Sequence, residues 1–360
     1  MRAIYIIGVL LSLQLMSCCK GGGNSEAFSG DTIPMKYAEH LIMVRFVDSV
    51  EVTLKDPWHE GRELKRYRIS KKEGIGTKNV VFNTAHVSLL QMLGALDAIK
   101  GVADLKYMNL PEVKKRVGEG RIIDCGDSMN PDIEKIIEME ADAIWLSPFE
   151  NSGGYGRLEK LGIPLIECAD YMETSALGRA EWMKFYGLLV GKEREADSLF
   201  AVVEKSYLQQ KRLAHGKKGR SVLTERMTGS VWYVPGGRSS MGRLLQDANA
   251  CYAWADDNHS GSLPLSFETI LDKVGDADIW VFNYIGDELL TYDRLGSEFH
   301  GYRQLKAFRT HNVYYVNSLK VPYFEEVSFR PDWLLEDYVK LLNSEVPPNE
   351  KLRYLKRIEY

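Results

Sequence analysis

The sequence lacks the motifs by which most metal-dependent and nucleophilic enzymes are detected. It has no Cys-x-x-Cys pair, no His-Glu-x-x-His helix, no Gly-x-Ser-x-Gly elbow and no phosphate-binding glycine loop. The missing cysteine pairs argue against a structural zinc site and a thioredoxin-like centre. The other absences remove the signatures of zinc proteases, serine hydrolases and P-loop nucleotidases. We therefore expect a protein that is not an enzyme and has no resident metal.

The sequence also has little excess charge of either sign. The formal net charge is -4, with acidic and basic residues interspersed along the chain. A protein that binds nucleic acid needs a basic stripe for the phosphate backbone, so nucleic-acid binding is not expected. Beyond the first residues, no apolar run is long enough to span a bilayer. Membrane contact is therefore expected only at the N-terminus.

Cysteine is scarce and widely spaced. Two of the five cysteines are adjacent near the start, and the others are Cys125, Cys168 and Cys251. We expect these three to be buried thiols, with one disulfide among them as the alternative in an oxidising compartment.

The first residues have the three regions of a secretory signal: Met1-Arg2, an apolar run over 3–15, and Ser17 before Cys18. The apolar run is too short for a stable spanning helix. The sequence Leu15-Met16-Ser17-Cys18 resembles a lipobox, which implies removal of 1–17 and lipidation of Cys18. The Gly/Ser-rich residues that follow are typical of a flexible tether, predicted over 18–35. The alternative is an ordinary leader or an uncleaved anchor, with Cys18 uninvolved.

The pattern of apolar residues predicts an α/β protein. Residues 36–70 alternate as short antiparallel strands do, and from Val80 to Cys168 apolar runs alternate with helical segments. Repeated strand-helix units predict a parallel sheet covered on both faces. Because the chain exceeds the size at which one core stops growing, two packed units are expected. The first lobe is predicted over 36–172.

A helical region separates the two predicted lobes. Between Ser175 and His215 the apolar spacing is helical throughout, and Gly191 divides it. A helix from Glu193 to Leu213 would be roughly 30 Å long at about 1.5 Å per residue. Bridging helices are therefore predicted over 173–215, a second α/β lobe over 216–345 and a tail over 346–360, with a ligand cleft between the lobes.

Five fragments, in this order and spacing, carry a family resemblance. They are Val80-Val81-Phe82-Asn83-Thr84 leading to Leu93-Gly94, Asn130-Pro131-Asp132-Ile133-Glu134 before Ala141-Asp142, Gly237-Arg238-Ser239-Ser240-Met241-Gly242, Ser266-Phe267-Glu268 before Ala277-Asp278, and Arg330-Pro331-Asp332-Trp333. Together they resemble the ABC-transporter solute-binding proteins for ferric siderophores, haem and cobalamin, over roughly 78–343. The sequence departs from the pattern of this family at two places: it has His86 in the first loop, and the segment 36–70 before the first lobe is longer than in the simplest members.

The resemblance implies a role for two glutamates. In that family one glutamate at the tip of each lobe meets an arginine on each subunit of a dimeric permease, and the matching residues are Glu134 and Glu268. Such charged rims steer docking more than they add affinity. A local role is the alternative, because Asn130 and Ser266 are plausible N-caps and a carboxylate in a first helical turn favours the helix dipole.

Ligand contacts in open α/β sheets come from loops at the carboxyl ends of strands. The candidates in such positions are Asn83, His86, Phe149, Tyr155, Trp232, Tyr233, Arg238, Trp254, Tyr284 and Tyr323. Aromatic rings supply apolar area for a bulky, partly apolar chelate or corrin. The alternative is core packing, above all for tryptophans inside strands. Arg238 would pair with an anionic ligand group or with a nearby carboxylate.

These observations predict a monomeric, lipid-anchored periplasmic protein of an ABC importer. Its ligand is expected to be a ferric siderophore, cobalamin or haem, captured with little hinge motion because one long helix joins the lobes. The residues after Cys18 lack an acidic cluster, so the periplasm is favoured over the cell surface. The alternatives are a receptor component that hands haem or a corrinoid to another carrier, and a zinc or manganese binder using His86 and His259.

Overall fold

The computed structural model describes residues 30–150, 154–343 and 351–359. The predicted signal peptide, Cys18 and most of the predicted tether lie outside these residues. Within the described part of the chain, no helix combines the length and the apolar character needed to cross a membrane.

The first lobe is built on a five-stranded parallel sheet. Its strands, in spatial order, are β11 (Leu165–Glu167), β10 (Ala143–Leu146), β5 (Asn79–Val81), β6 (Ile99–Val102) and β7 (Ile123–Asp124). Every residue of β5 and β10 is buried, as expected for strands with helices on both faces. The lobe's α-helices are α1 (Thr84–Met92), α2 (Pro111–Gly118) and α3 (Ile133–Glu138). The short strands β8 (Gly126–Asp127) and β9 (Asn130–Pro131) precede α3.

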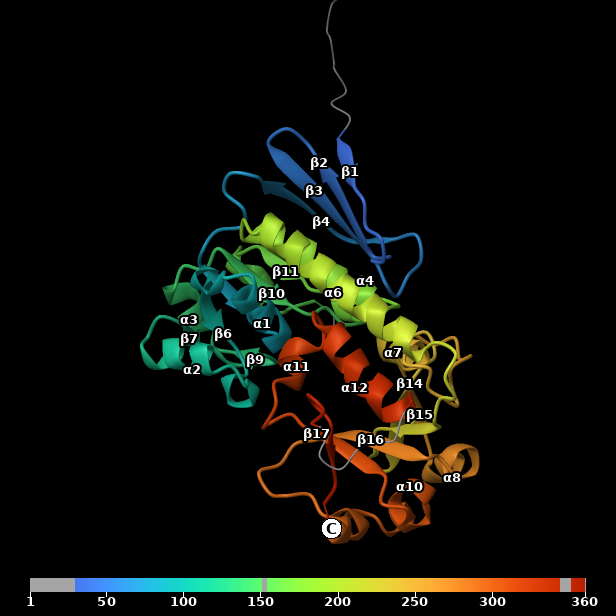
Figure 1. The fold of residues 1–360 in the computed structure, drawn as a ribbon. Helices are drawn as coiled ribbons and strands as arrows, with labels where there is room; N and C mark the ends of the chain where they lie inside the picture. Colours follow the sequence, from blue (N-terminus) through green and yellow to red (C-terminus); the bar gives the residue numbers. More distant parts are fainter. Residues whose placement is uncertain (1–29, 151–153, 344–350, 360) are drawn as a thin grey trace, which may run out of the picture.

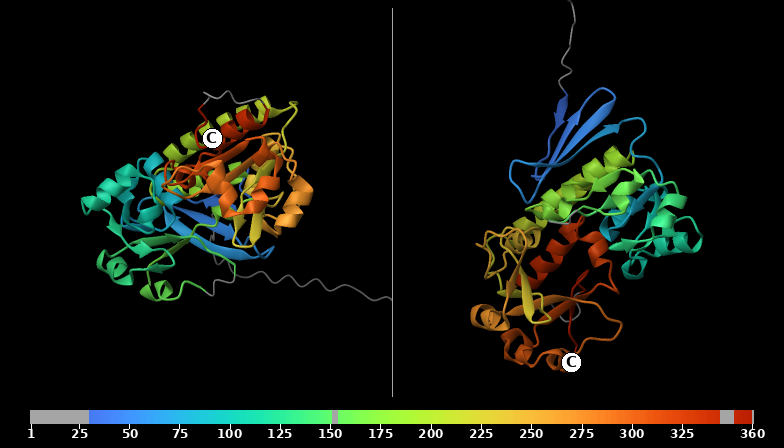
Figure 2. Two further views of the ribbon diagram at one scale, coloured as in Figure 1. Left: turned by 90° about the horizontal axis from the view of Figure 1, so that it is seen from below. Right: turned by 180° about the vertical axis from the view of Figure 1, so that it is seen from behind.

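A separate antiparallel sheet precedes this lobe. Its strands lie in the order β1 (Asp31–Ile33), β2 (Leu41–Arg45), β3 (Ser49–Lys55) and β4 (Glu63–Ser70). This sheet and the second lobe lie on opposite sides of the long helix Glu193–Ala214 (Figures 1 and 2). Antiparallel strands in 36–70 are confirmed, but the described fold begins earlier than predicted, because β1 pairs with β2 inside the stretch expected to be tether.

Two buried carboxylates hold the β1–β2 connection against the helices. The N–H groups of residues 36–38 donate to Glu181 over 2.7–3.0 Å, and those of 39 and 40 donate to Glu173 over 2.9 Å. Both side chains belong to nearly inaccessible residues, at 0% and 2% exposure. Charge-assisted hydrogen bonds of this kind are about twice as strong as neutral ones.

Replacing Glu181 by glutamine is expected to lower the free energy of unfolding by about 2 kcal/mol. The three backbone N–H groups are divided between the two carboxylate oxygens, so the NH₂ group of the amide must face at least one of them in either orientation. Urea unfolding of the purified protein measures the change. Glu195→Gln, on the exposed side of the next long helix, is the matched control and should shift stability by less than about 0.5 kcal/mol. Equal stability of the two variants would mean that this carboxylate does not hold the sheet.

Three helices connect the lobes: α4 (Ala176–Glu181), α5 (Met183–Leu189) and α6 (Glu193–Ala214). The predicted break at Gly191 is confirmed, since this glycine has a φ of 66° between α5 and α6. Helix α6 buries Ala196, Phe200, Val203 and Tyr207. This spacing of three and four residues places them on one face of the helix.

The second lobe contains two sheets. One has the order β12 (Val222–Thr224), β16 (Ile279–Tyr284), β17 (Val313–Asn317) and β18 (Lys356–Arg357), and the other has β13 (Met227–Thr228), β14 (Val231–Pro235) and β15 (Ser262–Leu265). The first is parallel except for β18, and the second is antiparallel. The lobe's helices are α7 (Ser240–Asp247), α8 (Phe267–Val274), α9 (Tyr292–Glu298), α10 (Lys306–Arg309), α11 (Tyr323–Glu326) and α12 (Pro331–Asn343).

Two details of this lobe differ from the sequence prediction. Besides the expected α/β sheet, the lobe contains the antiparallel sheet β13–β15, which was not predicted. Part of the predicted tail belongs to the lobe, because β18 pairs with β17 and Leu352, Tyr354, Leu355 and Ile358 are buried. The Asp337 carboxylate of α12 also accepts the N–H groups of residues 353–355 over 2.7–3.3 Å.

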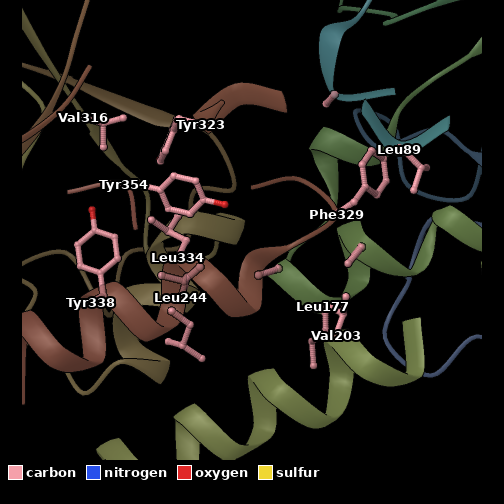
Figure 3. Close-up of a cluster of buried hydrophobic side chains, with 14 of the residues drawn as sticks. Leu89, Leu177, Val203, Leu244, Val316, Tyr323, Phe329, Leu334, Tyr338 and Tyr354 are labelled. Atoms are coloured by element: carbon pink, nitrogen blue, oxygen red, sulfur yellow. The ribbon is translucent and has the colours of Figure 1, made fainter. Parts of the chain in front are cut away.

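One continuous apolar core joins the lobes. It includes Leu89 of α1, Leu177 of α4, Val203 of α6, Tyr338 of α12 and Phe329 just before α12, all labelled in Figure 3. Because well-packed interiors resist deformation, this shared core favours a fixed relation between the lobes. A smaller cluster fills the opposite face of the first parallel sheet.

Candidate ligand-binding cleft

A cavity of about 1670 Å³ lies between the two lobes. Its walls come from the carboxyl ends of strands, where the backbone turns out of each sheet. Asn83 follows β5, Ser147 follows β10 and Glu225 follows β12, and all three line the cavity. Asn83 also caps α1, because its Oδ1 accepts the Ala85 N–H over 2.9 Å. The location agrees with the rule that ligands bind beyond the carboxyl ends of parallel strands.

Large apolar side chains from both lobes surround the cavity while remaining exposed. They are Tyr107, Met129 and Phe149 from the first lobe, and Tyr233, Ile285 and Phe324 from the second, with exposed fractions of 45–78%. Soluble proteins rarely leave so many apolar groups around one hollow unless a ligand or partner covers them. The cavity wall therefore favours a ligand with substantial apolar surface.

Five of the predicted ligand residues line this cavity: Asn83, Phe149, Tyr155, Tyr233 and Tyr323. The Tyr155 hydroxyl donates to Glu167, and burial together with this carboxylate raises the pKa of Tyr155. Its hydroxyl is thus engaged inside the lobe, and its ring contributes to the wall.

The other five predicted ligand residues do not line the cavity. His86, Trp232, Trp254 and Tyr284 are 0–7% exposed, and Arg238 is exposed outside the cavity. Trp232 donates its Nε1–H to the Thr224 carbonyl over 2.8 Å within the core. Neighbours in a strand point to opposite faces, so Tyr233 reaches the cavity and Trp232 cannot.

His86 belongs to a buried polar network. Its Nε2 lies 2.8 Å from Asp170 Oδ1, and that carboxylate also accepts from the Tyr186 hydroxyl over 2.7 Å and from Arg179 Nε over 3.0 Å. Burial opposes ionisation of Asp170, but the interactions with His86 and Arg179 outweigh it and hold its pKa at about 2. The His86 ring therefore lies in the core and does not reach the cavity, where it was predicted to contact the ligand.

Five charged residues that line the cavity were missed by the sequence analysis: Asp104, Arg157, Arg179, Glu225 and Arg226. Arg226 is paired with Glu298 and lies over the rings of Phe282 and Tyr284. An arginine beside the ligand was predicted at position 238, but Arg238 does not line the cavity. No sequence motif marks the five charged positions, because the tertiary fold brings them to the wall from separate loops and, for Arg179, from helix α4.

The two predicted docking glutamates are exposed in the first turns of α3 and α8, which lie in different lobes (Figure 1). The predicted cap of α8 is confirmed, since Ser266 Oγ accepts the Thr269 N–H over 3.3 Å. The predicted cap of α3 is wrong: Asn130 pairs in β9, and Asp132 accepts the Lys135 N–H instead. The backbone N–H at the helix start and then the Ser266 hydroxyl lower the pKa of Glu268.

The remaining candidates for metal or thiol chemistry lie apart. His259 is beside Asp257 on the surface, with 3.0 Å between His259 Nδ1 and the carboxylate. No three His, Cys, Asp or Glu side chains in the described ranges are grouped so that they could hold a metal ion. Cys125 and Cys168 are buried free thiols as expected, whereas Cys251 is an exposed free thiol.

Residues 80–318 match the periplasmic binding protein family. The chain therefore belongs to that family, whose members bind substrates for transport and are not enzymes. A lipoprotein of Methanocaldococcus jannaschii is 27% identical over 288 residues, which cover 77% of this chain and 68% of that protein. The family match begins at β5, so the antiparallel sheet β1–β4 lies before the matched residues.

Solved structures show the same two-lobed fold. The Fe³⁺-hydroxamate transport protein of Saccharomonospora viridis has a TM-score of 0.60 and 18% identity, covering 80% of this chain and 98% of that one. The periplasmic haem-binding protein of Pseudomonas aeruginosa has a TM-score of 0.60 and 14% identity, covering 79% and 98%. The predicted fold class, two α/β lobes joined by a long helix, is confirmed.

Proposed function

We propose that this protein is the substrate-binding component of an ABC importer for a metal chelate, either a ferric siderophore or a corrinoid. The observation that carries the proposal is the large interlobe cavity with exposed apolar side chains from both lobes. The names of its structural relatives, a Fe³⁺-hydroxamate transporter component and a haem-binding protein, support this ligand class.

The chemistry of the cavity suits a bulky ligand with a few polar groups. Aromatic and aliphatic side chains such as Phe149, Tyr233 and Ile285 supply contact area, and Arg157, Arg179 and Glu225 supply charge at separate points. Small-molecule sites are mostly apolar, with few polar groups that orient the ligand. We propose that the ligand enters with little hinge motion, since one core joins the lobes.

Delivery would use the surfaces at the two lobe tips. In this proposal Glu134 and Glu268 meet the two subunits of an inner-membrane permease, and lipidation of Cys18 keeps the monomer at a membrane in the periplasm. Paired charges at an exposed rim fix orientation and speed encounter. Both glutamates lie outside the cavity wall, so docking and ligand capture use different residues.

Native mass spectrometry and absorbance of the mature protein test the ligand class. We expect a one-to-one complex when the protein is mixed with dicyanocobinamide or with ferrioxamine B, and loss of about tenfold in affinity for Tyr233→Ser, because a buried aromatic contact is worth more than 1 kcal/mol. Val202→Ser, which removes an exposed apolar group from α6, is the matched control. Absence of binding to any ferric chelate or corrinoid would exclude the proposal.

A further inference from the structure

The second-lobe wall of the cavity contains a rigidly held carboxylate. Glu225 directly follows β12 and adopts a φ of 61°, which is unfavourable for a residue with a side chain. Its N–H donates to the Val281 carbonyl over 2.8 Å, and its own carbonyl accepts the Trp280 Nε1–H over 2.7 Å. The backbone that carries this carboxylate is thus held on both sides.

Asn283, at the neighbouring strand end in β16, lies beside this carboxylate. Its Nδ2 donates to Glu225 Oε1 over 3.2 Å, and both residues line the cavity. The amide orientation follows from the carboxylate, since the reverse would place two acceptor oxygens 3.2 Å apart. Asn283 Oδ1 is buried and has no hydrogen-bond partner among the described residues. Buried polar atoms are nearly always satisfied, so this oxygen retains the capacity to accept a hydrogen bond that the described residues do not supply.

The surroundings leave the Glu225 carboxylate without a cation bound to it. Within the described ranges no ion pair includes Glu225, and the adjacent Arg226 is paired with Glu298. Burial raises the pKa of Glu225 above its usual range, and the hydrogen bonds from Asn283 offset this only in part. This part of the wall therefore contains two acceptor groups, the Glu225 carboxylate and the buried amide oxygen of Asn283.

We propose that Glu225 and Asn283 form a subsite for a nitrogen of the ligand that carries at least two hydrogens, either a primary amide or an ammonium group. This inference rests on the proposed function and narrows its ligand class. Such a nitrogen can donate to Glu225 and to Asn283 Oδ1 at once, whereas a hydroxyl has one hydrogen to give. A carboxylate on the ligand would meet two acceptors and be repelled.

Two pairs of probes with matched metal centres test the subsite by calorimetry at pH 7. Dicyanocobinamide carries primary amides, and dicyanocobyrinic acid carries carboxylates around the same corrin. Ferrioxamine B ends in an ammonium group, and its N-succinyl derivative ends in a carboxylate on the same iron-binding chain. In at least one pair, the nitrogen-bearing member is expected to bind at least tenfold more tightly.

Glu225→Gln is expected to reduce that preference to less than threefold, because the new amide can turn either an acceptor or a donor toward the ligand. Glu288→Gln, on an exposed side chain outside the cavity, is the matched control and should keep the full preference. Thermal unfolding of each variant verifies that the fold is intact. The affinity ratio within each probe pair, measured on the wild-type protein, tests the subsite even if a variant fails to fold.

The outcomes separate this inference from the proposed function. Lack of preference in every pair that binds, tighter binding of the carboxylate members or of haemin with its propionates, or a preference that persists in Glu225→Gln would overturn the subsite and leave the binding function standing. Failure of every chelate and corrinoid to bind would overturn both.

Discussion

Reversing the charge of both proposed docking glutamates, by Glu134→Lys with Glu268→Lys, is expected to reduce ligand uptake by cells roughly 100-fold or more while ligand affinity stays unchanged. Removing one partner of a desolvated, hydrogen-bonded charge pair costs about 2–5 kcal/mol, and a lysine also faces the permease arginine with like charge. Affinity should persist because neither residue lines the cavity. Uptake of radiolabelled ligand and calorimetry on the purified variant measure the two quantities.

The same helices provide matched controls. Glu138 on α3 and Asp272 on α8 are exposed and lie one turn further along. The double variant Glu138→Lys, Asp272→Lys carries the same change in net charge, so it should retain uptake within about threefold if position rather than charge decides docking. Equal uptake by the two double variants would argue against an importer partner and favour a receptor component that passes its ligand to another carrier.

The sequence predicted the order of strands and helices well because burial on both faces of a parallel sheet leaves a plain pattern. The wholly apolar run 143–146 became β10, and Gly191 ended a helix where its positive φ is tolerated. The tail was missed for a physical reason. Residues 351–359 are held by long-range contacts with Asp337 and β17, which no local pattern in a polar segment reveals.

The site was half predictable for a similar reason. Positions after strands were identified correctly, so Asn83, Phe149 and Tyr155 lie at the cavity. For two neighbouring aromatic residues in a strand, the sequence pattern does not show which one faces the core. In the structure Trp232 faces the core and Tyr233 faces the cavity. No sequence motif marks Glu225, because its position in the wall depends on the left-handed backbone conformation of this residue after β12.

The largest stability change is expected for Asp170→Asn, which should lower the free energy of unfolding by about 3–5 kcal/mol. The carboxylate is 1% exposed and is the common acceptor for His86, Tyr186 and Arg179. Breaking a buried charge pair leaves the other charge uncompensated, which accounts for the size of the effect. Urea unfolding at pH 7 measures it. Asp97→Asn, at an exposed carboxylate paired with Arg116, should change stability by less than about 0.5 kcal/mol.

The pH dependence of unfolding separates this charge effect from a simple packing defect. The folded-state pKa of Asp170, about 2, lies below the ordinary aspartate value of 3.8, so the folded protein binds protons at this site less readily than the unfolded chain. The resulting stability, roughly 2 kcal/mol, is present above about pH 4 and is lost as the pH falls toward 2. Asp170→Asn should therefore remove part of the acid sensitivity between pH 4 and 2. If Asp170→Asn kept the wild-type dependence of the free energy of unfolding on pH in that range, the charge of Asp170 would not be what stabilises the network. The position of Arg179 at the cavity wall would then not depend on that charge.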